Sequence, residues 1–272
     1  MNRKARNNMA IIERNGTKIF YSIVGQGSPL VMLPGLTGDQ TMWGNIVLEL
    51  QKYYQVILID NRGAGRSQVT QAPFSISDMA NDVMSVIEKL NLKKTSILGH
   101  SMGSYVAQEF AIQYPEKLDK LILISTRCKA SPLSTIQSEI AFHLIESKID
   151  SIVLIKNSMT WCFGETFMSN EKNVTDYIER SLNRQYPTHL EGFKHQVLAI
   201  NFFENNSLEK IQAPTLIISG EEDRIAPIPY SDYMKKHIQN SQQVILKNVG
   251  HMPHIEDCDQ VVQHINEFLN HI

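Results

Sequence analysis

The stretch Gly99-His100-Ser101-Met102-Gly103 decides the fold of this chain, because it has the pattern of a serine held on a sharp turn. A short apolar run at residues 95–98 precedes it, and Met102, Val106 and Phe110 follow at helical spacing. Glycines are needed at such a turn because strand and helix pass too close for a β-carbon. Many chains contain an isolated Gly-x-Ser-x-Gly, but the strand–turn–helix context predicts that Ser101 is a nucleophile rather than an ordinary serine.

A serine hydroxyl needs a neighbouring base to act as a nucleophile, and that base needs a group that fixes its tautomer. The C-terminal third of the chain offers both. Residues 213–220 predict a buried strand whose following loop carries Asp223, and residues 243–246 predict another whose loop carries His251. The order Ser, Asp, His along the chain differs from that of chymotrypsin and of subtilisin. Ser101, His251 and Asp223 therefore form a candidate triad.

Four motifs carry a resemblance to a known family: Leu33-Pro34-Gly35-Leu36, the Asp-Asn-Arg-Gly-Ala-Gly-Arg-Ser loop at 60–67, the turn around Ser101, and the paired loops of Asp223 and His251. Together they are similar to the α/β-hydrolase superfamily, in particular its small lidded esterases, lactonases and cofactor-free haloperoxidase-like enzymes. The similarity covers nearly the whole chain, from about residue 11 to residue 268. It implies that Ser101 attacks the substrate, that His251 is the general base and that Asp223 orients the imidazole, with no metal or organic cofactor.

Outside residues 127–208 the chain alternates β-rich runs with helical segments, which predicts an α/β fold. We expect a mostly parallel twisted sheet with helices on both faces. Asn15-Gly16 predicts a hairpin between the first two strands. The expected strands lie at residues 10–13, 19–24, 30–33, 55–60, 95–98, 121–124, 213–220 and 243–246.

Several helix boundaries can also be predicted. We expect a helix over residues 42–50, and a next helix that is capped by Ser77 or Asp78. The helix after the nucleophile turn should run to Gln113 and stop at Pro115, because proline lacks a backbone donor and clashes with the preceding turn.

Residues 127–208 lack β-rich runs and carry apolar residues at helical intervals. In the family that this chain resembles, an insertion after the sixth strand is a helical lid. We therefore expect a lid at residues 127–208, inserted into a hydrolase core formed by residues 1–126 and 209–272. Acidic and basic residues roughly balance in the insertion, which gives no support for an acidic carrier-protein substrate.

An oxyanion hole needs two backbone N–H groups aimed at the developing negative charge. By the resemblance, one is the amide of Met102 and the other is the amide of Leu36. The family often has His-Gly where this chain has Pro34-Gly35, so the donor remains but a side chain that often braces the loop is absent. The loop at 60–67 is usually structural in the family, and we expect Arg62 to hydrogen-bond nearby backbone.

His254 is the rival of His251 as the general base. The family's Gly-His signature, with Glu256 five residues further on, favours His251. His100 is expected to be a packed neighbour of the nucleophile turn rather than a catalyst.

Glu221 and Glu222 are rivals of Asp223 as the carboxylate that orients the base. The spacing Gly220-x-x-Asp223-x-x-x-Pro227 matches the family's acid loop. This spacing favours Asp223 over its two acidic neighbours.

Substrate is expected to contact residues at the mouth of the site and in the lid. The lid residues are ambiguous, because Trp161, Phe163, Phe167 and Met168 either line the pocket or merely pack the lid. The expected substrate-binding residues are Trp43, Trp161, Phe163, Ile225 and Met252.

The composition is that of an ordinary globular protein: the 272 residues are 42% hydrophobic and 20% charged, with a net charge of −2 and a pI of about 6.5. No basic stripe favours nucleic-acid binding, and no apolar run approaches the roughly 18 residues that would predict a membrane span. The first eight residues are basic and polar, which is not typical of a secretory signal, and Met9 is an alternative start. Three cysteines without Cys-x-x-Cys spacing indicate reduced thiols in a cytoplasmic protein and no metal site.

These features predict a serine hydrolase that cleaves a small ester, lactone or thioester through an acyl-enzyme on Ser101. We expect the small-molecule substrate as its partner, and a monomer or homodimer as its state. Within the family, an enol-lactonase or short-chain carboxylesterase ranks ahead of a pimeloyl-type methyl esterase, a carbon–carbon bond hydrolase or a haloperoxidase-like enzyme. Serine at the nucleophile position argues against haloalkane dehalogenases and epoxide hydrolases, which use aspartate there. The alternative from another class is a non-catalytic α/β-hydrolase fold that binds a ligand.

Overall fold

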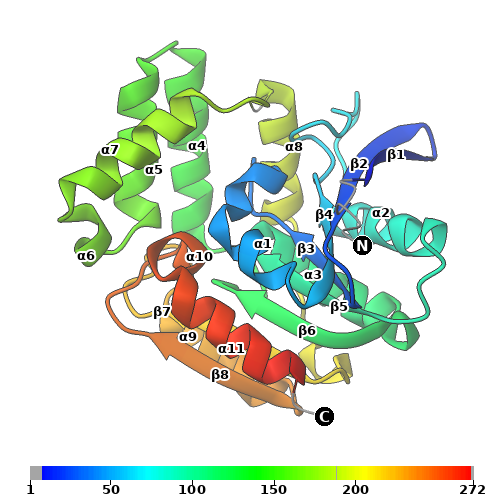
Figure 1. The fold of residues 1–272 in the computed structure, drawn as a ribbon. Coiled ribbons are helices and arrows are strands. Elements are labelled where there is room, and N and C mark those ends of the chain that lie inside the picture. The colour runs from blue at the N-terminus through cyan, green and yellow to red at the C-terminus, as the bar shows by residue number, and fades with distance from the viewer. Residues whose placement is uncertain (1–7, 188, 271–272) are drawn as a thin grey trace, which may run out of the picture.

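A computed structural model describes residues 8–187 and 189–270 of the chain. The strands of this described part are β1 (Asn8–Arg14), β2 (Thr17–Val24), β3 (Ser28–Leu33), β4 (Tyr54–Ile59), β5 (Thr95–His100), β6 (Leu118–Ile124), β7 (Thr215–Gly220) and β8 (Ser241–Leu246). They form one sheet in the order β1-β2-β4-β3-β5-β6-β7-β8 (Figure 1). β2 pairs antiparallel with β1 and with β4, whereas the pairings from β4 to β8 are parallel. The predicted α/β fold with a mostly parallel sheet is confirmed.

Helices cover both faces of the sheet, and a second group is inserted between β6 and β7 (Figure 1). The helices and 3₁₀ segments of the core are η1 (Gln40–Trp43), α1 (Asn45–Leu50), α2 (Ile76–Lys89), α3 (Met102–Gln113), η2 (Pro115–Lys117), η3 (Leu208–Lys210), α9 (Ile228–His237), α10 (Pro253–Glu256) and α11 (Cys258–Asn270). The inserted helices are α4 (Pro132–Glu146), α5 (Ser151–Cys162), α6 (Glu165–Met168), α7 (Glu171–Leu182) and α8 (Leu190–Asn201). The insertion after the sixth strand is therefore helical, as predicted. No helix in the described ranges is long and apolar enough to cross a membrane.

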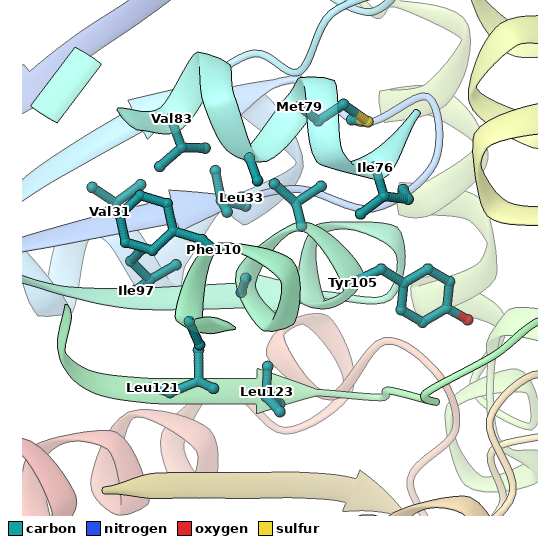
Figure 2. Close-up of a cluster of buried hydrophobic side chains, with 14 of the residues drawn as sticks. Val31, Leu33, Ile76, Met79, Val83, Ile97, Tyr105, Phe110, Leu121 and Leu123 are labelled. Atoms are coloured by element: carbon teal, nitrogen blue, oxygen red, sulfur yellow. The ribbon is translucent and has the colours of Figure 1, made fainter. Parts of the chain in front are cut away.

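The sheet separates two clusters of buried apolar side chains. Alternate residues of a strand point to opposite faces, so Val31 and Leu33 of β3 join the cluster under α2, α3 and α9, whereas Leu30 and Met32 join the cluster under α1 and α11. Figure 2 shows part of the first cluster, where Val31, Leu33 and Phe110 lie between the sheet and its helices. Because both faces of the central strands are covered, their sequences are continuous apolar runs rather than alternating ones.

All eight predicted strands are present, with ends that differ from the prediction by up to three residues, and the predicted hairpin turn and the end of α3 are confirmed. Asn15 and Gly16 form the turn of the β1–β2 hairpin, both with positive φ. The helix after the nucleophile turn, α3, ends at Gln113 before Pro115. Met9 lies within β1, where it pairs with Ser22. The expectation that the N-terminal segment is not a secretory signal concerns mainly residues 1–7, which lie outside the described residues.

Two expectations about helices are wrong: one helix is divided in two, and another is capped by a different residue. The single helix expected over residues 42–50 is divided into η1 and α1, because Gly44 between them has a φ of +52°, which is outside helical geometry. α2 is capped by Ser75, not by Ser77 or Asp78. The Ser75 hydroxyl accepts from the Asp78 amide while the Asp78 carboxylate accepts from the Ser75 amide, and this reciprocal pair starts the helix at Ile76.

Candidate active site

Ser101 occupies a strained turn between β5 and α3. Its φ of +51° lies in the left-handed region, which costs a residue that has a β-carbon about 1–3 kcal/mol and persists only where the surroundings enforce it. A β-carbon on Gly99 would lie 2.3 Å from the Gly103 carbonyl oxygen, and one on Gly103 would lie 2.0 Å from the Leu33 carbonyl oxygen. Only glycines fit at these two positions. They allow the turn to pass close to neighbouring backbone at the carboxyl end of β5.

The structure brings Ser101, His251 and Asp223 into one chain of hydrogen bonds. The Ser101 Oγ lies 2.9 Å from His251 Nε2, and His251 Nδ1 lies 2.8 Å from Asp223 Oδ2 and 3.0 Å from Oδ1. The three residues follow β5, β8 and β7, and the carboxyl ends of parallel strands share one edge of the sheet. Residues 150 positions apart along the chain therefore meet in space.

Asp223 is buried in a setting that keeps its carboxylate charged. Its Oδ1 also accepts hydrogen bonds from the amides of Ile225 at 2.8 Å and Ala226 at 2.7 Å. Burial alone would raise the pKa of Asp223, but His251 and these two amides outweigh burial and hold the pKa below its ordinary value. A charged carboxylate at this position accepts a hydrogen bond from Nδ1–H, which leaves the lone pair of His251 Nε2 directed to Ser101.

His100 and His254 lie behind the triad as neutral side chains. The Nε2 of His100 donates to the His251 carbonyl oxygen at 2.8 Å, and burial lowers the pKa of His100 to about 3. Neither ring nitrogen of His254 has a hydrogen-bond partner among the described residues, and burial lowers its pKa well below the ordinary value. Its ring packs 4.7 Å from that of His100 and 5.2 Å from that of Trp43. The structure thus places His251, not His254, at Ser101.

Glu221 and Glu222 hydrogen-bond backbone amides instead of His251. Glu221 accepts from the amide of Asn248 at 3.3 Å, and Glu222 accepts from the amide of Glu165 at 2.5 Å. Of the three neighbouring carboxylates, the structure brings Asp223 to the imidazole.

The loop at residues 34–38 passes directly beside the nucleophile. A β-carbon on Gly35 would lie 3.2 Å from the Ser101 β-carbon, so the backbone that carries the Leu36 amide borders Ser101. Met102 is the first residue of α3, and the first amides of a helix have no intrahelical acceptor. Both expected oxyanion donors therefore lie on backbone next to Ser101.

Polar side chains from elsewhere brace this loop where Pro34 offers no side-chain donor. Asn61 donates to the Pro34 carbonyl oxygen at 2.8 Å, and Gln196 of α8 accepts from the Thr37 amide at 2.8 Å. Arg184 also donates to the Thr37 carbonyl oxygen. None of these three residues was predicted from the sequence to support the loop. Asn61 is within the 60–67 motif, but Gln196 and Arg184 lie 159 and 147 residues from Thr37, and no local pattern marks them.

Arg62 has a different main partner from the one expected. It donates to both carboxylate oxygens of Asp82 on α2 at 2.6 Å, and only one weaker bond of 3.3 Å goes to backbone, at Asp78. A guanidinium matches a carboxylate in this paired geometry better than it matches a carbonyl. A buried ion pair, rather than bonds to backbone, is therefore the main contact that Arg62 makes from the loop at 60–67.

The expected substrate-binding residues fall into two groups. Trp43 and Phe163 are fully buried, and Phe163 stacks on Phe167 with ring centroids 4.3 Å apart. Both side chains therefore pack the interior and present no surface to a substrate in this conformation. Trp161, Ile225 and Met252 are half-buried and keep exposed surface.

The described part of the chain shows no clustering of metal-ligating residues around this site. Within the described ranges, no group of three or more His, Cys, Asp or Glu side chains is placed to hold a metal ion. Cys128, Cys162 and Cys258 are free thiols.

The chain belongs to the α/β-hydrolase fold family, whose sequence model matches residues 28–257. The parallel sheet, the nucleophile turn and the loops of Asp223 and His251 described above all lie within that match. The protein is a hydrolase of this fold.

Relatives of nearly full length accompany the family match. The chain is 29% identical over 266 residues to a 2-hydroxy-6-oxononadienedioate/2-hydroxy-6-oxononatrienedioate hydrolase of Pseudomonas putida, covering 93% of this chain and 92% of that protein. A thermophilic esterase from Thermogutta terrifontis superimposes with a TM-score of 0.84 at 28% identity, covering 96% and 98% of the two chains. The enol-lactonase from Burkholderia xenovorans LB400 superimposes with a TM-score of 0.85 at 22% identity, covering 96% and 99%, and at that identity it shows the shared fold alone.

Proposed function

We propose that this hydrolase cleaves a small carboxylic ester, lactone or thioester through an acyl-enzyme on Ser101. The observation that carries the proposal is the hydrogen-bonded chain from the Ser101 hydroxyl through His251 to the buried carboxylate of Asp223. A nucleophile on a strained turn, in contact with a base that is in turn held by an acid, is the arrangement that acyl transfer requires.

The reaction follows from these positions. Ser101 Oγ attacks the substrate carbonyl carbon while His251 Nε2 takes the hydroxyl proton, and the amides of Leu36 and Met102 stabilise the oxyanion. The imidazolium, held by Asp223, returns the proton to the leaving alcohol or thiol as the bond to the acyl carbon breaks. Water then gives a proton to His251 as it attacks the acyl carbon. The imidazolium returns this proton to Ser101 Oγ as the bond from Oγ to the acyl carbon breaks, which releases the carboxylic acid and restores the serine.

The inserted helices are proposed to form a lid over this chemistry, with residues 127–208 as lid and the rest as core. The insertion supplies Gln196, which accepts from the Thr37 amide in the loop beside Ser101. It also supplies Cys162, whose carbonyl oxygen accepts from the amide of His251, and the preceding residue, Trp161, is half-buried. Trp161, Ile225 and Met252 are then the side chains that select the acyl group, and exclusion of water strengthens the oxyanion donors.

The free thiols support a reducing, cytoplasmic location.

A serine-directed fluorophosphonate probe tests the proposal. The protein should form one covalent adduct, which peptide mass spectrometry locates on Ser101. A non-catalytic ligand-binding fold would remain unlabelled, and an adduct on another residue would refute the assignment. p-Nitrophenyl esters of increasing chain length, together with lactones and thioesters, would then identify the substrate class.

A second candidate is cleavage of a carbon–carbon bond, because the relative from Pseudomonas putida is named as a hydrolase of a 2-hydroxy-6-oxo-dienedioate. The same substrate panel should include a compound of that kind. Turnover of this compound with no turnover of the esters would favour the second candidate.

A further inference from the structure

Glu256, the last residue of α10, has its carboxylate among backbone amides of two segments that lie far apart in the sequence. Its Oε2 accepts from the amides of Gly164 at 2.8 Å and Gly250 at 2.9 Å, and its Oε1 accepts from the amide of Met252 at 3.0 Å. Gly250 and Met252 are the two neighbours of His251. One carboxylate therefore holds both sides of the proposed base and also the insertion.

The two segments also contact each other directly through backbone. A β-carbon on Gly250 would lie 2.5 Å from the Gly164 nitrogen, and one on Gly164 would lie 3.1 Å from the Gly250 nitrogen. The amide of His251 donates to the Cys162 carbonyl oxygen at 2.8 Å. Residues 162–164 of the insertion thus complete the loop that carries His251, and glycines allow the approach.

Both oxygens of the Glu256 side chain act as acceptors although the residue is only partly exposed. Burial raises the pKa of Glu256, and the amides of Gly164, Gly250 and Met252, together with His251, offset this only in part. Hydrogen bonds from amides to a carboxylate are shorter and stronger than those between neutral groups. Because the side chain accepts from the amides on both sides of His251, it restricts the positions that this loop can take.

We propose that Glu256 is a positioning residue that fixes the His251 loop and residues 162–164 of the insertion as one unit. The unit keeps Nε2 of His251 within hydrogen-bond reach of Ser101 and prevents the insertion from moving independently of the base. The inference rests on the proposed function, because the placement of His251 matters only if His251 is the base.

The first test is Glu256→Gln, with Glu267→Gln as the matched control. The nitrogen of the substituted side-chain amide cannot accept a hydrogen bond, so at least one of the three backbone donors loses its acceptor. Glu267 is an exposed residue of α11 that pairs with His264, so its substitution makes the same charge change away from the site. We expect kcat and the rate of phosphonate labelling of Ser101 to fall on the order of 10- to 100-fold in Glu256→Gln, with KM changed less than about 3-fold. Glu267→Gln should keep the parent values.

The outcomes separate the two proposals. If the parent protein is not labelled at Ser101, the proposed function fails. If the parent is labelled and Glu256→Gln reacts within about 2-fold of its rate, only the positioning role is overturned. A variant that loses thermal stability but keeps kcat would show that Glu256 supports the fold and not the base.

Hydrogen exchange of the parent protein provides a test that does not depend on a variant's folding. If Glu256 joins the two segments, the amides of Gly164, Gly250 and Met252 should exchange slowly and with the same free energy of opening, although they lie outside long regular elements. Different opening free energies for Gly164 and Gly250 would show that the insertion opens without the His251 loop, and would overturn the inference.

Discussion

Replacing Asp223 with asparagine should reverse the tautomer of His251 while leaving the loop in place. Asp223 Oδ1 accepts from the amides of Ile225 and Ala226, so the oxygen of an asparagine will stay on those two donors. Its NH₂ group then occupies the position of Oδ2, which lies 2.8 Å from His251 Nδ1. Facing a donor, Nδ1 must become the acceptor, and the ring proton moves to Nε2, where it points at the Ser101 hydroxyl.

A base with the proton on the wrong nitrogen cannot deprotonate Ser101. We expect kcat to fall by about 10²- to 10⁴-fold in Asp223→Asn, which corresponds to roughly 2.7–5.4 kcal/mol of lost transition-state stabilisation. The assay is steady-state hydrolysis of a p-nitrophenyl ester, accompanied by the rate of fluorophosphonate labelling. Glu222→Gln is the control, because Glu222 bonds the backbone of Glu165 and not the imidazole. If Glu222→Gln is the more damaging change, or if Asp223→Asn retains near-parent activity, the reasoning about the orienting carboxylate is wrong.

The same substitution has a signature in the pH dependence of stability. The folded pKa of Asp223 is below its ordinary value, so the charged carboxylate stabilises the folded state above the unfolded pKa, near 3.9, and this contribution is lost as the pH falls toward the folded value. The parent should therefore exceed Asp223→Asn in Tm by the largest margin above about pH 5, and the margin should shrink below about pH 4. A margin that grows in acid would contradict the lowered pKa.

Ser101→Ala removes one oxygen at a turn, so it should fold normally, lose about 10⁴-fold or more in kcat, and take up no phosphonate probe as judged by intact-protein mass spectrometry. His251→Ala should be about as damaging to kcat as Ser101→Ala because the two groups act as one unit, whereas His254→Ala should be much milder, and the reverse ranking would exchange their roles. Trp161→Ala should change the acyl-chain preference across p-nitrophenyl esters more than the rate on the acetate, and an unchanged chain-length profile would remove Trp161 from the pocket. Phe163→Ala should lower the free energy of unfolding by about 3–5 kcal/mol in a denaturant titration, because its ring is fully buried, and a loss below about 1 kcal/mol would show that the ring does not pack the interior.

Features that depend on neighbouring residues could be predicted from the sequence. The Asn15-Gly16 hairpin, the end of α3 before Pro115 and the tight turn at Ser101 each follow from the conformational limits of glycine or proline within a few positions. The wrong prediction of the α2 cap also concerns residues within a few positions of each other. Ser75 caps α2 in place of Ser77 or Asp78, because several polar residues in one turn compete for the cap. Pattern alone does not rank such neighbours, since their capping free energies differ by less than the packing around them contributes.

Two aromatic residues of the insertion show what local sequence pattern does not predict. Trp161 and Phe163 are two positions apart in one apolar segment, yet Phe163 is fully buried against Phe167 and Tyr177 while Trp161 keeps exposed surface. Periodicity marks both as apolar positions of a helix end. Which of them faces inward is decided by what packs against the segment, and that comes from elsewhere in the chain.

The sequence by itself determined the class of fold and the identities of Ser101, Asp223 and His251 as a candidate triad, because each lies in a turn whose glycines or spacing are required locally. Only the tertiary structure decided how these residues are held. Glu256 reaches the amide of Gly164, 92 residues away, and Gln196 reaches the amide of Thr37, 159 residues away. The physical reason is that a hydrogen bond needs its atoms within about 3 Å. A folded chain brings such distant groups together only through the packing of whole helices and strands, which no short stretch of sequence encodes.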